Sequence, residues 1–127
     1  MNAGDPHPPL SRSLVGSWRL TSRVDVTAEG RRHPDPALGE HPVALLIYDR
    51  GGHFAAQFMK RDRSTTGPVA AAPGFNNSRA QDGYDAYFGE YRVDDATGEV
   101  WQRLLGALSK ENVGMELTRA MRVDGDT

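Results

Sequence analysis

The chain alternates between apolar and polar residues over long stretches, a pattern that predicts β-strands rather than helices. From Gly16 to Thr27 the sequence is GSWRLTSRVDVT; its apolar side chains share the parity of Trp18, and only Ser22 interrupts their row. Successive side chains of a strand point to opposite faces, so alternation predicts a strand with one buried face. We therefore expect a first strand from Gly16 to Thr27.

The middle of the chain predicts a β-hairpin. Val43–Tyr48 is a continuous apolar run, Asp49–Gly52 is a polar and glycine-rich turn, and His53–Met59 is the expected return strand. A continuous apolar run predicts burial on both faces, or a strand lying between a cavity and a helix.

The last third predicts an antiparallel meander. Tyr84–Asp94 is expected to pair, through a turn at 95–98, with a strand at Glu99–Leu108. A further strand is expected at Val113–Val123, and Asp124–Asp126 reads DGD, which is typical of another hairpin turn.

The other segments are expected to be irregular. Residues 1–12 contain GDPHPP, whose prolines exclude a helix or a central strand there, so we expect a flexible tail before one domain at 13–127. The segment Lys60–Gly83 is long for a hairpin loop, which indicates a functional lid or an excursion. Within it, Asn77 could cap a short helical turn over Ser78–Gln81.

Composition excludes several classes of protein. A chain of 127 residues with 38% hydrophobic and 25% charged residues predicts one globular domain. The net charge of −2 and the scattered basic residues argue against a nucleic-acid partner. No segment reaches the length of a signal peptide's apolar core or a membrane span, so we expect a soluble, cytoplasmic protein with no membrane partner.

Metal and cofactor chemistry is also not predicted. The chain has no cysteine, and its histidines have no spacing that suggests a shared metal. They are His7, His33, His41 and His53. Phosphate-cradling and dinucleotide-binding glycine motifs are missing, and DRGGH is a hairpin turn, so we expect no cofactor.

Four blocks of sequence, in order, resemble the lipocalin-like domain family of bacteria and fungi. They are LVGSWRLTS at 14–22, GEHPVALLIYDRGGHFAAQFMKRDR at 39–63, YDAYFGEYRVDDATGEV at 84–100 and VGMELTRAMRVDGD at 113–126. The resemblance implies an all-β fold, a lipocalin-like up-and-down antiparallel β-barrel of about eight strands with an apolar interior. It also implies that Trp18 closes the narrow end of the barrel, with Arg119 as its candidate cation–π partner.

The chain departs from the family pattern in two ways. The family continues with two further strands after the DGD turn, so six strands would leave open edges. Either the sequence is a truncated fragment, or strands of a second copy complete the sheet, which would make a homodimer. Relatives also carry histidines where Gln102 and Arg103 stand, so no histidine chemistry is transferred to this chain.

Aromatic side chains are the candidate ligand-binding residues, because they would line a hollow barrel. The set is Trp18, Tyr48, Phe54, Phe58, Tyr87, Tyr91 and Met115. By parity, Tyr87, Gly89 and Tyr91 are expected to face inward, with Gly89 marking either space for a ligand or a bend. By the same criterion Glu90 and Glu116 are expected to face water, while Asp94 and Asp95 belong to a turn.

These observations favour binding of a small hydrophobic or amphipathic molecule inside the barrel. The alternative is a cofactor-independent cyclase or isomerase acting on a polyketide-like or terpenoid-like substrate, an analogy at the level of fold. Its candidate acid–base groups are Tyr48, Tyr87, Tyr91, Glu116 and Arg103, and none is assigned as catalytic. A third hypothesis is a filled-core module that binds a protein through its surface.

Overall fold

The computed structural model describes residues 8–26, 28–33, 38–64 and 80–127, and its regular secondary structure is almost entirely β-strand. In chain order the elements are α1 (Leu10–Ser13), β1 (Gly16–Arg19), β2 (Asp25–Val26), β3 (Arg32–His33), β4 (Val43–Tyr48), β5 (His53–Met59), β6 (Tyr84–Asp94), β7 (Glu99–Ala107), the 3₁₀ turn η1 (Lys110–Asn112) and β8 (Glu116–Ala120).

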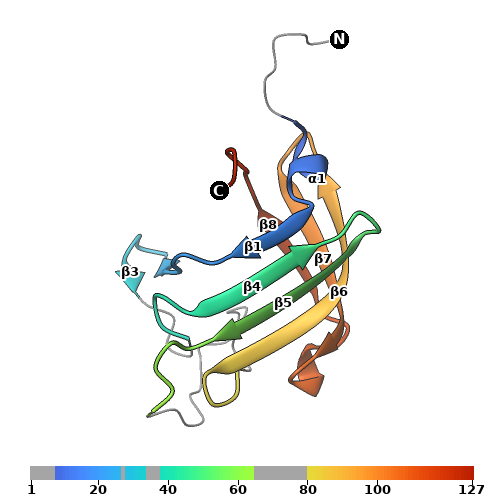
Figure 1. Ribbon diagram of the computed structural model, residues 1–127. Coiled ribbons are helices and arrows are strands. Elements are labelled where there is room, and N and C mark those ends of the chain that lie inside the picture. The colour runs from blue at the N-terminus through green and yellow to red at the C-terminus, as the bar shows by residue number, and fades with distance from the viewer. Residues whose placement is uncertain (1–7, 27, 34–37, 65–79) are drawn as a thin grey trace.

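Six strands form one antiparallel sheet in the order β1-β4-β5-β6-β7-β8 (Figure 1). β2 and β3 form a separate two-stranded ribbon. Every sheet neighbour from β4 onward is also the next strand of that sheet along the chain, as in a meander. The predicted all-β antiparallel fold is therefore confirmed, although no pairing joins β1 to β8 among the described residues.

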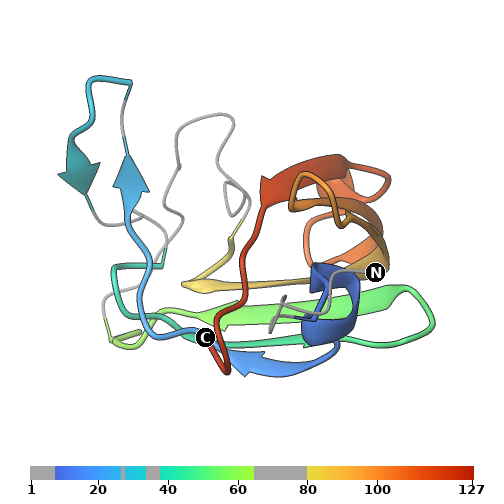
Figure 2. The same ribbon diagram turned by 90° about the horizontal axis from the view of Figure 1, so that it is seen from above.

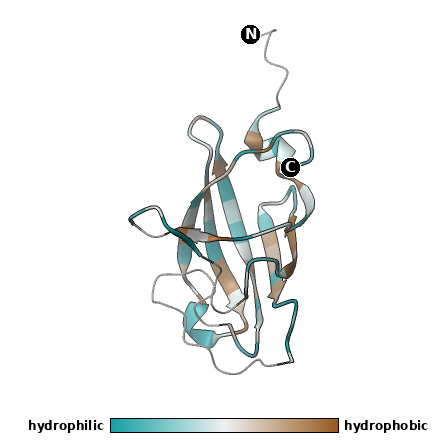
Figure 3. Ribbon diagram, turned by 90° about the vertical axis from the view of Figure 1, so that its left-hand side faces the viewer, coloured by the Kyte–Doolittle hydropathy of each residue, from teal (hydrophilic) through white to brown (hydrophobic). Residues whose placement is uncertain are grey.

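β4 and β5 have the predicted bounds, because the polar and glycine-rich turn at residues 49–52 separates the two strands. The turn between them is closed by hydrogen bonds in both directions between Asp49 and the backbone of His53, at 2.9 Å and 2.8 Å. Buried and more exposed residues alternate along both strands, and Figure 3 shows hydrophilic and hydrophobic positions interspersed along the strands of the sheet. We call the face that carries Ala44, Leu46 and Tyr48 the inner face of the sheet, and the opposite face the outer face.

The predicted burial of the run Val43–Tyr48 on both faces was wrong. Val43, Leu45 and Ile47 point to the outer face and are 40–44% exposed. In the described part of the chain no helix covers that face, so only the alternate residues of the run are buried.

The first strand is shorter than predicted, because its partner ends. β1 pairs with β4 only as far as Arg19↔Leu45, and β4 begins at Val43, directly after Pro42. Proline lacks the N–H that a sheet ladder needs. Beyond Arg19 the chain follows β4 loosely and then separates from it to form the β2–β3 ribbon.

The sheet curls so that β7 and β8 lie over the inner face of β4 and β5 (Figure 2). The register between β6 and β7 shifts between Phe88 and Gly89, where Leu105 on β7 is the extra residue, as in a β-bulge, which bends a pair of strands. A side chain at Gly89 would overlap the carbonyl oxygen of Arg103 on β7, so this glycine allows close backbone approach. Of the two predicted roles for Gly89, the bend is the one the structure supports.

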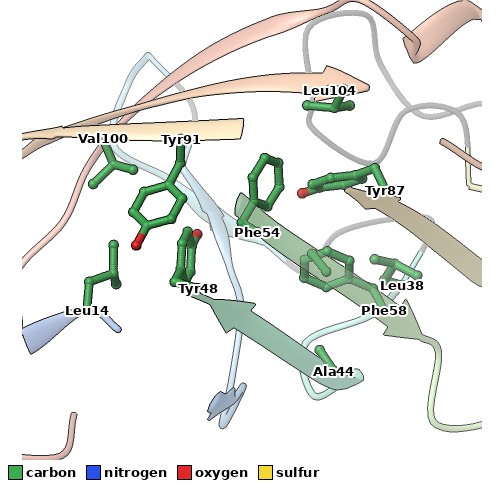
Figure 4. Packing of buried hydrophobic residues seen from close by; sticks show 11 residues of the cluster. Leu14, Leu38, Ala44, Tyr48, Phe54, Phe58, Tyr87, Tyr91, Val100 and Leu104 are labelled. Atoms are coloured by element: carbon green, nitrogen blue, oxygen red, sulfur yellow. The ribbon is translucent and has the colours of Figure 1, made fainter. Parts of the chain in front are cut away.

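The buried core lies on the inner face of the sheet (Figure 4). It consists of Leu14, Leu38, Ala44, Tyr48, Phe54, Ala56, Phe58, Tyr87, Tyr91, Val100 and Leu104. Tyr87 and Tyr91 face inward as their parity predicted, while Glu90 and Glu116 are exposed, also as predicted.

Part of the predicted tail is folded. Leu10–Ser13 forms α1, and Ser11 donates to both carboxylate oxygens of Asp95, from its amide at 2.7 Å and its hydroxyl at 2.6 Å. Proline cannot continue a helix but is tolerated at its start, and α1 begins directly after Pro9. The prediction of an unstructured segment was therefore wrong for Leu10–Arg12.

Two further predictions concern loops. Asp124 and Thr127 exchange backbone hydrogen bonds of 2.8 Å and 3.0 Å, so the predicted turn at the DGD sequence is present. Asn77 and Ser78 lie outside the described residues, as does most of the segment predicted to be a lid or an excursion.

Candidate functional site

A pocket of about 260 Å³ opens on the inner face of the sheet, where β4 and β5 face β7 and β8. It is lined by Leu20, Arg23, Leu46, Tyr48, Ala56, Phe58, Tyr87, Gln102, Arg119 and Met121. The volume is slightly below the range of about 300–1,000 Å³ for sites that bind drug-sized ligands. The pocket is therefore suited to a small molecule.

Aromatic rings and aliphatic side chains form most of the pocket wall. The Phe58 and Tyr87 ring centroids lie 5.9 Å apart, and Tyr87 packs edge-on against Phe54 at 6.0 Å (Figure 4). Leu46, Ala56 and Tyr87 are cross-strand neighbours, so the small side chain of Ala56 leaves space between two larger ones.

A hydrogen-bonded network of polar side chains crosses this apolar wall. Arg119 Nε on β8 donates to Gln102 Oε1 on β7 at 3.0 Å, and Gln102 Nε2 donates to the Tyr48 hydroxyl on β4 at 2.8 Å. Arg119 Nη2 also donates to the Tyr87 hydroxyl on β6 at 3.4 Å. Four strands thus contribute to one network, and Arg23 adds a second guanidinium to the lining.

The tyrosine hydroxyls of the pocket are held in the neutral form. Burial raises the pKa of Tyr48 to about 12, although the positive charge of Arg119 acts in the opposite direction. Burial also raises the pKa of Tyr87, against the opposing charges of Arg119 and Arg23. At neutral pH both groups are therefore hydrogen-bonding phenols and not phenolate bases.

A buried carboxylate, Asp85, lies beside the pocket on β6. Its exposed fraction is 0%, and one of its oxygens accepts a hydrogen bond of 2.9 Å from the amide of Ala86. Its negative charge contributes to the raised pKa of Tyr87. The sequence prediction did not assign Asp85 to the interior, although it shares the parity of the inward-facing Tyr87.

A comparison with protein families identifies the chain. The family model described as a lipocalin-like domain matches residues 15–127. The chain belongs to the lipocalin-like domain family. No curated protein and no solved structure shows significant similarity to it. The resemblance drawn from the four sequence blocks is thereby confirmed.

The lipocalin-like domain brings only part of the predicted ligand-binding set together. Tyr48, Phe58 and Tyr87 line the pocket. Phe54 and Tyr91 belong to the adjoining core, and the Tyr91 hydroxyl donates to the carbonyl oxygen of Asp49 at 2.6 Å, which secures the β4–β5 turn.

The other two predicted residues lie outside the pocket lining. Trp18 is half-buried against the core, and its indole Nε1 donates to the carbonyl oxygen of Leu14 at 2.8 Å. Met115 is 38% exposed. It lies just before β8, which begins at Glu116, so it is not part of the strand that turns Leu117 and Arg119 inward. Arg119, expected beside Trp18, instead hydrogen-bonds Gln102 and Tyr87.

Gln102 is a pocket-lining residue that the sequence prediction missed. It was noted only as a departure from the histidines of relatives, yet it connects Arg119 to Tyr48. Its parity on β7 is that of the buried Val100 and Leu104, and this parity was the available signal.

The lipocalin-like domain has a larger hollow of about 520 Å³ beside α1. Its lining includes Ser11, Arg12 and Arg50, which are exposed, so it lacks the apolar wall that a buried ligand requires. Catalytic candidates Arg103 and Glu116 are exposed as well.

No group of three or more potential metal ligands occurs among the residues that the structure describes. His53 lies 3.7 Å from the carboxylate of Asp49, with both side chains largely exposed. Within the same residues, no helix has the length and apolarity needed to cross a membrane.

Proposed function

We propose that this lipocalin-like domain binds a small hydrophobic or amphipathic molecule in the pocket on the inner face of its sheet. The observation that carries this proposal is the combination of an apolar wall with a buried polar network drawn from four strands. A concave apolar site with a few convergent polar groups is the usual design of small-molecule sites. Membership of the family supports the same function.

The two parts of the wall have different roles in this proposal. Removing apolar ligand surface from water supplies most of the affinity, at about 25 cal/mol per Å². The hydroxyl and guanidinium groups orient the ligand, because buried polar groups favour ligands that complete their hydrogen bonds.

The catalytic alternative receives less support from the geometry. Efficient general acids and bases have pKa values near the working pH, and burial moves the pKa values of Tyr48 and Tyr87 away from it. Glu116 and Arg103 are exposed, and the hydroxyl of Tyr91 is bonded to the carbonyl of Asp49.

The test fills the pocket with a side chain. Ala56→Leu adds three carbon atoms between Leu46 and Tyr87, in the pocket itself. Ala55→Leu is the matched control, because Ala55 is the neighbouring residue on β5 and points to the outer face between Ile47 and Phe88. Binding is measured with N-phenylnaphthylamine, an uncharged probe whose fluorescence increases in apolar surroundings.

We expect the wild-type protein and Ala55→Leu to bind the probe with equal affinity, and Ala56→Leu to bind it at least about tenfold more weakly. Circular dichroism and thermal unfolding check that both variants are folded. Equal binding by both variants, or no binding by the wild-type protein, would contradict the proposed function.

A further inference from the structure

The hydrogen-bonding direction within the pocket network is fixed by Arg119. A guanidinium only donates hydrogen bonds, so the atom of Gln102 that faces Arg119 Nε at 3.0 Å must be the carbonyl oxygen Oε1. The amide nitrogen Nε2 therefore faces Tyr48, and the Tyr48 hydroxyl accepts its hydrogen bond at 2.8 Å. The Tyr87 hydroxyl is also an acceptor, because Arg119 Nη2 donates a hydrogen bond of 3.4 Å to it.

Both tyrosine hydroxyls consequently keep their own hydrogen atoms for donation. Among the described residues, the structure gives neither O–H an acceptor, although every hydrogen bond of these two tyrosines is accounted for. Tyr48 is only 2% exposed and Tyr87 only 5%, and both side chains line the pocket. A buried donor without an acceptor destabilises the protein, so an acceptor atom in the pocket would bind favourably.

The charges around the pocket favour an acceptor that is negative. The guanidinium groups of Arg119 and Arg23 both belong to the lining, and both act on Tyr87 as positive charges. Asp85 is the carboxylate that acts on the same hydroxyl, and it lies outside the lining. Hydrogen bonds to charged acceptors are roughly twice as strong as those to neutral ones.

We infer that the natural ligand is a small apolar molecule bearing a carboxylate, which accepts hydrogen bonds from Tyr48 and Tyr87 beside the guanidinium of Arg119. This inference rests on the proposed function, that the pocket holds a ligand. The apolar part of the ligand lies against Leu46, Ala56 and Phe58. Gln102 positions the Tyr48 hydroxyl and does not contact the ligand in this account.

The first arm of the test compares two probes that share one ring system, of which one is charged and the other neutral. Naphthoic acid and its methyl ester compete with N-phenylnaphthylamine for the wild-type protein at neutral pH, where the acid is ionised. We expect the acid to bind at least about tenfold more tightly than the ester, as a charged hydrogen-bond acceptor requires.

The second arm removes the donors singly. Tyr48→Phe and Tyr87→Phe are each expected to weaken binding of naphthoate by about tenfold and to leave binding of the ester nearly unchanged. Tyr91→Phe is the matched control, because it also removes a buried hydroxyl, but one whose hydrogen is bound by the Asp49 carbonyl outside the pocket. We expect Tyr91→Phe to bind both probes as the wild-type protein does.

The outcomes separate this inference from the proposed function. If the ester binds as tightly as the acid and both are excluded by Ala56→Leu, the pocket binds apolar molecules and the carboxylate inference is overturned. If neither naphthoate nor its ester displaces N-phenylnaphthylamine, the carboxylate inference is overturned and the proposed function stands. If N-phenylnaphthylamine itself does not bind the wild-type protein, both proposals fail. If a tyrosine variant does not fold, the comparison of acid and ester on the wild-type protein still decides the inference.

Discussion

Tyr48 and Tyr87 show how burial determines what a residue can do in this pocket. Both side chains are buried in the apolar core, and burial disfavours the charged phenolate despite the nearby guanidinium of Arg119. The same groups on a protein surface would titrate near pH 10. In the pocket they stay protonated at neutral pH, and we propose that they orient a ligand by donating hydrogen bonds.

The raised pKa of Tyr48 predicts a specific loss of stability in alkali. Its pKa is about 12 in the folded state and 10 ordinarily, so the folded state retains its proton where the unfolded state releases it. The stabilisation is complete below about pH 10 and is lost as the pH rises through about 12, at most about 3 kcal/mol. Urea unfolding from about pH 8 to pH 12 measures this loss.

Tyr48→Phe should flatten that alkaline decline, because phenylalanine does not ionise. Ultraviolet absorbance of tyrosinate should show one residue fewer among those that ionise late. An identical alkaline loss of stability in the wild-type protein and Tyr48→Phe would contradict the assignment of this loss to Tyr48.

Gly89 is the residue whose substitution should damage the fold most directly. A Cβ there would overlap the carbonyl oxygen of Arg103 on the neighbouring strand, and backbone atoms cannot move aside cheaply. We expect Gly89→Ala to destabilise the protein by about 3 kcal/mol. Gly51→Ala is the control, because its Cβ would meet only side-chain atoms at 3.5 Å or more, and it should change stability by less than about 1 kcal/mol. Equal unfolding midpoints for the two variants would contradict the packing argument.

The alternation of side chains along a strand allowed the inward orientation of some residues to be predicted from sequence, but not that of others. It placed Tyr87 and Tyr91 inward because β6 is long and regular. The same parity includes Asp85, and the parity of β7 includes Gln102, but polar side chains are usually exposed and were not assigned to the interior. Gln102 is buried among hydrogen-bond partners on β4 and β8, which a local sequence pattern does not contain.

At the scale of elements, the contact between α1 and the β6–β7 turn fixes the start of the domain to the sheet. Asp95 accepts two hydrogen bonds from Ser11, and these bonds lower the pKa of its carboxyl. Leu10 packs against the core from the same helix. The helix has only four residues, so its stability depends on such tertiary contacts.

The Ser11–Asp95 contact predicts a loss of stability in acid. Since the folded pKa is lowered, the contribution is present above the ordinary carboxyl pKa and disappears as the pH falls through the folded value. Asp95→Asn should therefore unfold at a lower temperature than wild type at neutral pH, and the difference should shrink in acid.

Asp124→Asn is a control for the general effect of removing a carboxylate, since Asp124 pairs only with exposed Arg122 in the described structure. Thermal unfolding at neutral and acidic pH measures both variants. A constant difference between Asp95→Asn and wild type at all pH values would contradict the proposed role of the carboxylate.

The elements were predictable where turns and alternation agreed. The bounds of β4, β5 and β6 follow directly from the sequence, because polar turns limit β4 and β5 and a long alternating run defines β6. β1 was predicted too long because its length is set by the point at which β4 begins, after Pro42, and this is a property of the partner strand. α1 was not predicted because four residues carry too little periodic signal.

At the scale of the molecule, the pocket exists because the sheet curls. Tyr48 and Gln102 are 54 residues apart in the chain and form a hydrogen bond only because β7 folds over β4. The bulge at Gly89 and the close approach of β7 are part of that curvature. Sequence alternation predicts which side of each strand is buried but not how strongly the sheet bends, so the pocket and its network became visible only in the structure.

The central claim is that a ligand binds to the inner face of this curled sheet, and nuclear magnetic resonance tests it most directly. A ¹⁵N-labelled protein is titrated with naphthoate, and the shifts of backbone and side-chain amide signals are followed. We expect the largest shifts at Ala56, Tyr87 and Gln102, including the Gln102 side-chain amide, with little change at Ile47 and Phe88 on the outer face. Shifts concentrated on the outer face, or none at saturating naphthoate, would contradict the account.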